Sequence, residues 1–335
     1  MSETLSVVMP VYNEAPYLHD TIEALVAAVR QSELVTELVL VDDGSTDGSA
    51  DVGRTTLRDR LPLTVITQPN RGRVEARRAG LEAARSEWVL LLDGRVRMRT
   101  GSLTFVRDRL PAGETVWNGH VHVDRDRNPY GAFWNVLAEI AWRAYFDDPR
   151  TTSFDAGSFD LYPKGTGCFL APRALLLEAA AAFRSGYADL RRANDDTPLL
   201  RWIAGRERIH LSPSFACDYR PRATFGSFVR HSVHRGTVFL DGHGRPESRF
   251  FPAVALFFPV SAALAAVSLR RPTVIPAAGV AIGLAAGATA AASGRSAFET
   301  ASAVALAPVY AVAHGAGMWR GLALMARRRL GTGRA

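Results

Sequence analysis

The chain has 335 residues, of which 47% are hydrophobic, with a formal net charge of +7 and two cysteines. This length allows one large domain with an appendage, and two cysteines exclude a disulfide framework or a cysteine-based zinc site. The basic charge suits an anionic membrane surface or an anionic substrate. No zinc-finger, RNA-binding or helix-turn-helix pattern accompanies it, so we expect no nucleic-acid partner.

Strand and helix patterns alternate in the first hundred residues. Apolar runs predict strands over 5–11, 37–41, 63–67 and 88–92, and periodic runs predict helices over 16–32, 47–60 and 73–84. This alternation predicts an α/β domain with a central, mainly parallel sheet. The polar first residues lead directly into a strand, without a signal-peptide pattern, so we expect this domain in the cytoplasm.

Polar residues follow three of the predicted strands, at residues 12–14, 42–44 and 93–95. Ligands gather at the carboxyl ends of strands in open α/β sheets, so these residues are candidates for a binding site. The segment from Asp42 to Ser45 is equally typical of a simple turn and helix cap. The region 111–170 is less regular and rich in aromatic residues, and we interpret it as walls of an acceptor site or as ordinary core.

The composition changes near residue 250. Residues 250–269, 273–292 and 301–319 carry no charge, and each stretch is long enough to cross a membrane. We therefore expect a catalytic domain over 1–245, a membrane region over 250–325 with two or three hydrophobic segments, and a basic tail over 326–335.

The topology of the membrane region has two interpretations. Three spans from a cytoplasmic start would leave Arg270-Arg271 and the tail arginines outside, against the positive-inside tendency. If the segment 250–269 does not cross the membrane, Arg270-Arg271 and the tail arginines both lie on the cytoplasmic side. Pro252 and Pro259 weaken that segment as a straight span, so we favour two full spans and one partial one.

Several motifs in chain order resemble those of the family 2 glycosyltransferases over about residues 5–240. They are VMPVYNE at 8–14, VDDGSTDG at 41–48, NRG at 70–72, LDGR at 92–95, GTGCF at 165–169 and NDDTPL at 194–199. The resemblance implies a GT-A fold that binds a nucleotide-activated sugar. It also implies the residues that contact the donor: Pro10, Tyr12, Glu14, Asp42, Asp43, Arg71, Asp93, Arg95 and Arg235.

The family resemblance places Asp93 beside the diphosphate, where relatives carry Asp-x-Asp and hold a divalent cation. Here Arg95 stands in place of the second aspartate. Either Asp93 holds Mg²⁺ or Mn²⁺ with the diphosphate and water, or the Arg95 guanidinium takes part of the charge neutralisation. We expect a cation requirement.

The same resemblance makes Asp196 the base that deprotonates the acceptor hydroxyl, with Asp195 orienting the acceptor or tuning its neighbour's pKa. The segment from Asn194 to Pro198 also fits a plain helix N-terminus. Arg235 lies where polymerising relatives carry Gln-x-x-Arg-Trp. Ser232 and Gly236 replace the Gln and Trp, which indicates a single transfer with Arg235 on the diphosphate.

Together these features predict an inverting glycosyltransferase that acts at the cytoplasmic membrane face on a lipid-linked or polysaccharide acceptor. The tail, with the run 313–321, is similar to the ends of exopolysaccharide glycosyltransferases. A polyprenyl-phosphate glycosyl synthase is the alternative within the same class. A non-catalytic membrane scaffold that retains the fold is the alternative from another class.

Overall fold

The computed structural model describes residues 4–332, and the side chains of residues 4–329. The chain forms two compact units, which we call the sheet unit and the helical unit. The sheet unit comprises residues 1–122, 144–184 and 195–220, and the helical unit comprises 123–143, 185–194 and 221–335. By compactness, segments before residue 245 therefore group with the apolar C-terminal helices.

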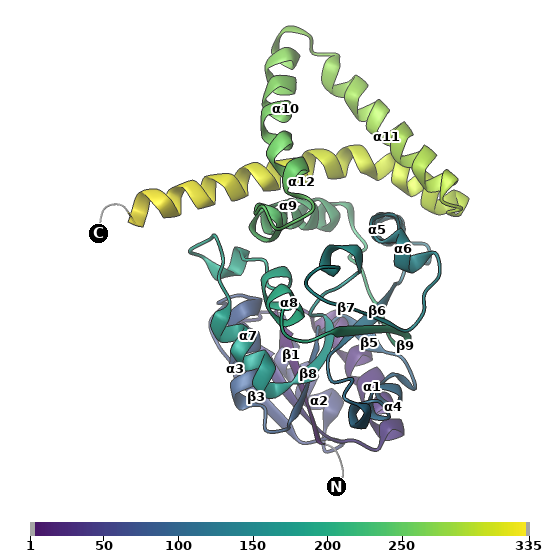
Figure 1. Cartoon of the computed structure of the whole chain (residues 1–335), viewed down its shortest axis with the longest axis vertical. Helices are drawn as coiled ribbons and strands as arrows, with labels where there is room; N and C mark the ends of the chain where they lie inside the picture. The colour runs from purple at the N-terminus through teal and green to yellow at the C-terminus, as the bar shows by residue number, and fades with distance from the viewer. Residues whose placement is uncertain (1–3, 333–335) are drawn as a thin grey trace. The chain divides into compact units, whose positions relative to one another are not determined.

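The sheet unit is built on one mixed sheet of nine strands within the described residues (Figure 1). The strand order is β3-β2-β1-β4-β8-β6-β9-β5, and β7 pairs with β9. The strands are β1 (Thr4–Val11), β2 (Val35–Asp42), β3 (Leu63–Thr67), β4 (Trp88–Leu92), β5 (Val96–Met98), β6 (Trp117–Val123), β7 (Thr152–Phe154), β8 (Cys168–Pro172) and β9 (Ile209–Tyr219).

Strands β3, β2, β1 and β4 are parallel, whereas β8 pairs antiparallel with both β4 and β6. The four parallel strands are those that the apolar runs predicted, so the predicted parallel centre is confirmed. The antiparallel extension comes from β5 to β9, all after residue 95. Two of these strands, β5 and β7, have only three residues, which is too short for a periodic pattern to be recognised in a sequence.

Helices cover the sheet and form the helical unit. They are α1 (Ala15–Ser32), α2 (Ser49–Leu57), α3 (Arg73–Ala83), α4 (Ser102–Arg107), α5 (Pro129–Ala141), α6 (Arg143–Phe146), α7 (Arg173–Ala182), α8 (Thr197–Ala204), α9 (Phe225–His243), α10 (Phe251–Arg270), α11 (Val274–Ala292) and α12 (Ala297–Thr332). Three short 3₁₀ turns complete the chain: Leu110–Ala112, Phe159–Leu161 and Leu190–Arg192.

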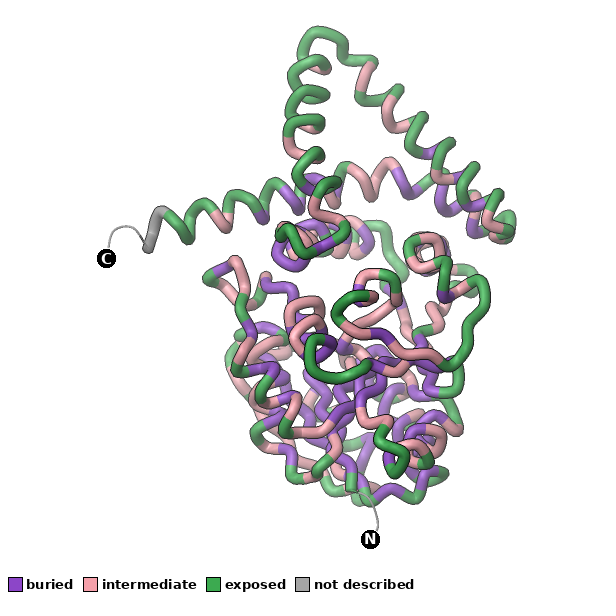
Figure 2. The backbone as a smooth tube through the Cα atoms, viewed as in Figure 1, coloured by how far each residue is buried: buried purple, intermediate pink, exposed green. Residues whose placement is uncertain are grey.

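The core of the sheet unit consists of the apolar residues of β1, β2 and β4 with the inner faces of α1 and α4 (Figure 2). Helix α3 lies on the sheet at Gly80, where an added Cβ would stand 2.3 Å from the Val8 side chain. Only glycine permits so close an approach. This packing fixes α3, and therefore the side chains at its N-terminal end, against the carboxyl edge of the parallel strands.

The helical unit contains three helices that are long and apolar enough to cross a membrane, among the residues described. They are Phe251–Arg270, Val274–Ala292 and the part of α12 over Ala297–Arg329. The predicted apolar segments are thus helical, and they give the chain a membrane anchor. Helix α10 continues through Pro259, and α12 extends well beyond the predicted segment 301–319.

Candidate active site

The ends of β1 and β2 are joined by a network of hydrogen bonds. Asn13 has a left-handed backbone with φ of 54°, donates its N–H to Ser45 Oγ at 3.0 Å, and accepts the N–H of Thr46 at 2.8 Å. Asp47 and Ser49 accept the first backbone N–H groups of the turn into α1. The loop after β2 therefore holds the loop after β1 in one conformation.

Asp42 and Asp43 are both buried and both order loops. Asp42 Oδ1 accepts the N–H of Ser45 at 2.8 Å, as the turn interpretation expects. The Asp43 carboxylate accepts the side-chain amide of Gln68 and the N–H groups of Arg71 and Gly72, all at 2.7–2.8 Å. Asp43 therefore fixes the start of α3, and contact of either aspartate with a nucleotide stays a prediction.

One buried arginine gathers three carboxylates at the carboxyl edge of the sheet. Arg77 of α3 donates to Asp93 Oδ1 at 2.8 Å, forms a short ion pair with Asp195, and lies 3.7 Å from Asp196 Oδ1. Its side chain is only 4% exposed. Arg73, one turn earlier and about half exposed, pairs with Asp195 at 3.2 Å. We call these residues the Arg77 cluster: Arg73, Arg77, Asp93, Asp195 and Asp196.

Arg77 is not among the site residues predicted from the sequence. The signal was present, because Arg73 and Arg77 are four residues apart and therefore share one face of a helix that follows a strand end. A buried arginine requires carboxylate partners, and the three partners come from positions 16 to 119 residues further along the chain. Only the folded topology brings them together.

Asp196 occupies the N-cap position of α8, yet its side chain makes no capping hydrogen bond. Asp196 Oδ1 instead accepts from the Thr166 hydroxyl in a short hydrogen bond and from the Thr166 N–H at 3.3 Å. The side chain is 39% exposed, whereas that of Asp195 is 6% exposed. The helix-cap interpretation therefore does not account for the orientation of this carboxylate.

The two adjacent aspartates have opposite pKa shifts. Burial and the neighbouring Asp195 carboxylate raise the pKa of Asp196 above its usual value. Burial also opposes the ionisation of Asp195, but Arg73 and Arg77 outweigh it and lower the pKa of Asp195. A pair of carboxyl groups with separated pKa values can divide a structural role from proton transfer. Here Asp196 is the more basic and more open member.

Asp93 is the first residue after β4, and it contacts the loop 165–167. Its N–H donates to the Gly167 carbonyl at 2.9 Å, and a Cβ on Gly167 would lie 3.2 Å from Asp93 Oδ2. The side chain is 27% exposed. Asp93 is thus a single, partly open carboxylate with one oxygen engaged by Arg77.

The residues present fit a divalent cation only as one carboxylate ligand. Within residues 4–332 no group of three or more His, Cys, Asp or Glu side chains is arranged to hold a metal ion. Mg²⁺ is commonly held by one or two carboxylates together with substrate phosphates and water. Asp93 meets that minimum, with the other ligands left to a diphosphate and solvent.

Arg95 does not face the Arg77 cluster. Its Nε lies 2.5 Å from Glu14 Oε2, its guanidinium stacks 4.0 Å from the Tyr17 ring centre, and the side chain is 7% exposed. Burial opposes its charge, but Glu14 raises the pKa of Arg95. The cationic group beside Asp93 is therefore Arg77, and Glu14 and Arg95 form a closed pair under the loop after β1.

The other predicted donor contacts differ in accessibility. Tyr12 is 49% exposed at the end of β1, and Arg71 is exposed before α3, so both have surface for a ligand. Pro10 is buried within β1. Arg235 belongs to the helical unit, on α9, where its guanidinium lies 5.4 Å from the Trp134 ring centre.

Strand β6 adds polar residues that are not among the site residues predicted from the sequence. Asn118 Oδ1 accepts the N–H of Gly165 at 3.0 Å, which connects β6 to the loop beneath Asp196. His120 is hydrogen-bonded through Nδ1 to the Tyr145 hydroxyl at 2.7 Å, and burial lowers the pKa of His120 to about 4. A neutral histidine and an aromatic ring therefore lie on β6 and α6, within the region 111–170 that was predicted to form walls of an acceptor site.

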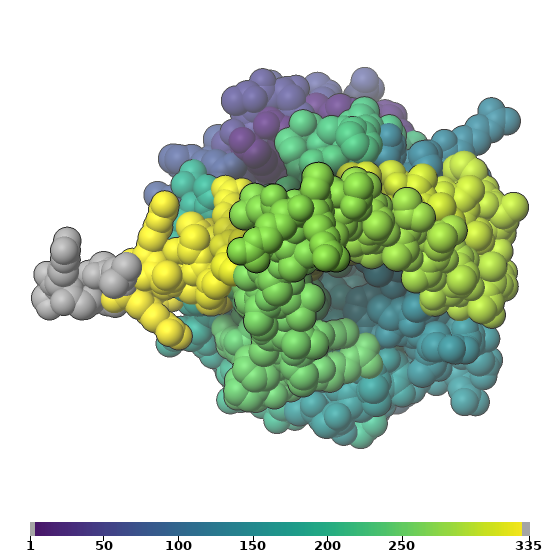
Figure 3. Space-filling model, turned by 90° about the horizontal axis from the view of Figure 1, so that it is seen from above, coloured from purple at the N-terminus to yellow at the C-terminus, as the bar shows by residue number. Residues whose placement is uncertain are grey.

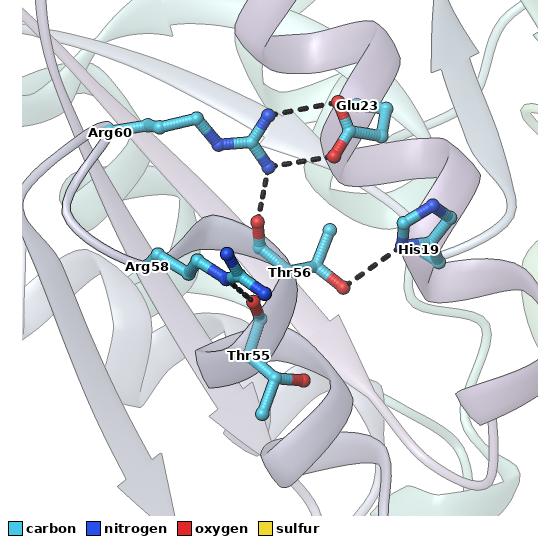
Figure 4. Close-up of a pocket in the computed structure, with 6 residues that line it drawn as sticks. All are labelled: His19, Glu23, Thr55, Thr56, Arg58 and Arg60. Atoms are coloured by element: carbon cyan, nitrogen blue, oxygen red, sulfur yellow. Dashed lines mark hydrogen bonds and ion pairs between the residues drawn. The ribbon is translucent and has the colours of Figure 1, made fainter.

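A separate cavity of about 480 Å³ lies between α1 and the end of α2 (Figure 4). Within it, Arg60 forms two hydrogen bonds with Glu23, and His19 contacts Thr56. The cavity contains none of the predicted site residues. Its lining also includes Arg58, whose guanidinium donates to the Thr55 carbonyl.

A mixed sheet with a parallel centre, covered by helices, gives this unit a GT-A fold. Residues 6–152 match the model of "Glycosyl transferase family 2". This match, which covers less than half of the chain, identifies residues 6–152 as a family 2 glycosyltransferase domain.

Curated relatives align with a restricted part of the chain. Glycosyltransferase GlyG of Streptococcus pneumoniae is 34% identical over 94 residues, which are 28% of this chain and 30% of that protein. Undecaprenyl-phosphate 4-deoxy-4-formamido-L-arabinose transferase of Proteus mirabilis is 37% identical over 91 residues, 27% of this chain and 28% of that protein. The matched part spans about a third or less of these relatives.

Two solved structures share the fold over nearly the whole chain. Staphylococcus aureus TarS 1–349 in complex with UDP-GlcNAc has a TM-score of 0.55 at 17% identity and covers 98% of this chain and 92% of its own. The mannosyltransferase PcManGT from Pyrobaculum calidifontis, in complex with GDP-Man and Mn²⁺, has a TM-score of 0.51 at 21% identity, with 98% and 88% covered.

Proposed function

We propose that the protein transfers a sugar, with inversion, from a nucleoside diphosphate sugar to a lipid-linked acceptor at the cytoplasmic face of the membrane. The observation that carries this proposal is the Arg77 cluster. In it, the partly exposed Asp196 carboxylate has a raised pKa and lies beside the Asp195 carboxylate at the carboxyl edge of the sheet. The membrane anchor supports an acceptor that resides in the bilayer.

The donor would bind along the ends of β1, β2 and β4. Tyr12 would stack on the base, while Asp42 and Asp43 would accept hydrogen bonds from the base or ribose. Arg71 and Arg73, exposed at the start of α3, would bring positive charge to the diphosphate. The role of Arg235 on the diphosphate stays a prediction. Neighbours in complex with UDP-GlcNAc and with GDP-Man support a nucleoside diphosphate sugar as the donor class.

Asp196 would act as the base. Its carboxylate accepts the proton of the acceptor hydroxyl while that oxygen bonds to the anomeric carbon on the face opposite the diphosphate. The bond between the anomeric carbon and the diphosphate oxygen breaks, and the nucleoside diphosphate leaves with the electron pair. Asp195, ionised and paired with both arginines, would hold Arg77 in place and keep Asp196 basic.

Asp93 would hold a divalent cation, Mg²⁺ or Mn²⁺, which when bound neutralises charge on the departing diphosphate. The Mn²⁺ complex of a fold neighbour supports this assignment. Arg77 limits how far Asp93 can move and compensates the negative charge of the cluster, so the site retains its shape before the donor arrives.

A second acceptor class has specific support. The Proteus mirabilis relative is named as an undecaprenyl-phosphate transferase, and a Rhizobium johnstonii relative is named dodecaprenyl-phosphate galacturonate synthase, at 36% identity over 92 residues. In such a reaction the acceptor would be the lipid phosphate itself. A phosphate oxygen is already ionised and needs no base.

The test is a panel of nucleoside diphosphate sugars incubated with the full chain and membrane lipid extract, with and without EDTA. We expect one labelled sugar to enter the lipid fraction with inverted anomeric configuration, and EDTA to suppress the transfer. Mass spectrometry of the product separates the two acceptors, because the second yields one sugar on a lipid monophosphate. Tight nucleotide binding with no transfer under any cation would instead support a non-catalytic scaffold.

A further inference from the structure

One loop of the helical unit leads directly into the aspartates of the Arg77 cluster. It comprises residues 185–194, and we call it the 185–194 loop. Asn194 is its last residue, and the next residue, Asp195, belongs to the sheet unit. Consecutive Cα atoms are a fixed distance apart across a planar peptide bond. Contacts that fix Asn194 therefore also restrict the backbone of Asp195 and Asp196.

A buried carboxylate of α9 closes this loop at both ends. Asp241 Oδ1 accepts the N–H of Gly186 at 2.6 Å, and Asp241 Oδ2 accepts the N–H of Asn194 at 2.9 Å. The Ser185 hydroxyl donates to Oδ2 at 2.8 Å. Asp241 is 1% exposed. The first two residues of the loop and its last residue are thus bound to one side chain.

Asp241 forms no ion pair with any residue that the structure describes. A buried carboxylate without a cationic partner must be compensated by hydrogen bonds. The three hydrogen bonds that Asp241 accepts all come from the 185–194 loop. If the loop moved away, the carboxylate would lose these donors, so the carboxylate and the loop stabilise each other.

Two further hydrogen bonds connect the loop to backbone carbonyls of α9. The side-chain amide of Asn194 donates to the Val238 carbonyl at 3.0 Å. The Tyr187 hydroxyl donates to the Thr237 carbonyl at 2.6 Å. Asn194 is therefore bound to α9 through both its backbone and its side chain, which leaves its position little freedom.

The start of the loop also contacts the C-terminal part of α12. Arg328 donates to the Ser185 carbonyl in a short hydrogen bond, and a Cβ on Gly186 would stand 2.8 Å from the Met325 side chain. Figure 3 shows that this part of α12, in yellow, projects beyond α10 and α11, in green. The loop is thus packed between two helices of the helical unit.

The two aspartates after the loop depend on exact placement. Asp195 pairs with Arg77, and Asp196 accepts from the Thr166 hydroxyl, both over short distances. The Asp196 side chain makes no capping hydrogen bond to α8. A shift of the Asn194 backbone would therefore displace both carboxylates from Arg77 and Thr166.

We propose that Asp241 is a positioning residue for sugar transfer. By closing the 185–194 loop on α9, it fixes Asn194, and through Asn194 it sets where Asp195 and Asp196 meet Arg77. The proposal rests on the proposed function, in which Asp196 is the base. It gives α9 a part in the reaction that is exerted through the backbone and not by contact with the substrate.

The variant that tests this role is Asp241→Asn in the full chain. An asparagine side chain has one acceptor oxygen and one NH₂ group. In either orientation, the N–H of Gly186 or that of Asn194 faces an NH₂ group and loses its acceptor. The volume of the side chain is kept, so the change removes the closure of the loop without creating a cavity.

Glu299→Gln is the matched control. Glu299 is also a buried carboxylate of the helical unit, at 5% exposure, and it accepts from Asn135 at 3.0 Å and pairs with Arg125 at 3.3 Å. These partners do not belong to the 185–194 loop. We expect Glu299→Gln to lose stability but to keep the kcat of the parent protein.

We expect Asp241→Asn to reduce kcat by about 10- to 100-fold, because a displacement of a reacting group by about 1 Å has an effect of this size. Donor affinity should stay unchanged, and the stoichiometry of donor binding in calorimetry counts the folded enzyme. A purely structural role would lower the amount of folded enzyme and leave kcat per folded molecule unchanged. The parent kcat in Asp241→Asn would therefore overturn the proposal.

Hydrogen exchange measures the geometric part of the proposal without any transfer assay. Peptides covering residues 195–200 should exchange about tenfold faster in Asp241→Asn and at the parent rate in Glu299→Gln. Unchanged exchange in Asp241→Asn would overturn the proposal even if kcat fell. If the parent protein transfers no sugar, the proposed function fails, whereas the exchange result still shows whether Asp241 holds this segment.

Ser185→Ala replaces Asp241→Asn if that variant does not fold. It removes one donor to Asp241 and leaves both backbone donors in place. We expect a reduction in kcat of about two- to tenfold, the equivalent of one hydrogen bond, with faster exchange over residues 195–200. Faster exchange at the parent kcat would contradict the positioning role, as would unchanged exchange.

Discussion

Two buried arginines of the sheet unit, Arg77 and Arg95, meet carboxylates in different ways. Arg77 joins three aspartates, two of which remain 27% and 39% exposed, whereas Arg95 is closed against Glu14 and Tyr17. Both arginines form ion pairs in a low-dielectric interior, so burial of either set of charges carries an unfavourable desolvation free energy. Only the first leaves carboxylates accessible to a ligand. A buried charge by itself is therefore no sign of a site, and the exposure of its partners is what separates the two.

The largest effect is expected for Arg77→Met. Removal of the guanidinium leaves Asp93, Asp195 and Asp196 close together without compensation, which should lower the free energy of unfolding by about 3 to 5 kcal/mol. Sugar transfer should be abolished. Chemical denaturation of the detergent-solubilised chain measures the first effect, and the transfer assay measures the second.

Arg77→Lys serves as the companion variant if the methionine protein does not fold. A single ammonium keeps the charge but cannot reproduce the forked contacts to Asp93 and Asp195. We expect a folded protein with transfer reduced at least tenfold. Full activity of Arg77→Lys would contradict the role given to the geometry of the cluster.

The pair of Arg95 and Glu14 should respond in the opposite way when both partners are removed. Either single change, Arg95→Met or Glu14→Gln, leaves one buried group uncompensated and should cost about 3 kcal/mol. The double variant should return to within about 1 kcal/mol of the parent protein and keep most of the transfer activity. A double-mutant cycle on the free energy of unfolding measures this coupling.

Loss of activity in the double variant, with stability intact, would place Arg95 on the diphosphate after all. That result would restore the second interpretation of the segment from Asp93 to Arg95. It would also weaken the contrast between the two arginines.

Gly167→Ala probes the position of Asp93. The added Cβ would lie 3.2 Å from Asp93 Oδ2, so the carboxylate must shift by a few tenths of an ångström. We expect about a tenfold loss of transfer, because small misplacements of reacting groups are costly. The matched control is Gly205→Ala, whose Cβ meets only ordinary contacts at 3.5 and 3.7 Å. If Gly167→Ala reduced transfer no more than Gly205→Ala does, Asp93 would tolerate the displacement.

The smallest expected effect is that transfer activity and folding are lost at different pH values. The pKa of Asp196 is raised, so transfer should fall as the pH drops through a value above that of an ordinary aspartate. The pKa of Asp195 is lowered, so its contribution to stability is present above its unfolded pKa of about 3.9 and is lost only below it. Between these values the protein should remain folded and inactive.

Paired measurements of kcat/KM and of the melting temperature across this range would detect that interval. Coincident loss of activity and of folding would mean that acid unfolding, and not protonation of Asp196, ends the reaction.

The sequence predicted the parts of the fold that depend on local pattern. The strands ending at Val11, Asp42 and Leu92 lie side by side as expected, because apolar runs and polar strand ends are local signals. The orientation of Arg77 and Arg95 was not predictable in this way. Arg77 lies within helix α3 and Arg95 follows the end of β4, and the carboxylate partners of both lie elsewhere in the sequence.

The membrane helices show the same limit. Apolar length predicted α10, α11 and part of α12 correctly as helices. It could not reveal that α12 is held to α9 by glycines at 236 and 317, because that contact depends on packing between distant segments. Hydropathy alone therefore does not distinguish these three helices, although their packing contacts differ.

The central claim is that the Arg77 cluster is a transfer site in which Asp196 is the base. The most direct test is the transfer rate of Asp196→Asn at saturating donor, with donor affinity measured separately by calorimetry. We predict a loss of about 10²- to 10⁴-fold in rate with donor affinity and stability nearly unchanged. Transfer by Asp196→Asn at the parent rate would contradict the claim, and would point to an acceptor, such as a lipid phosphate, that needs no base.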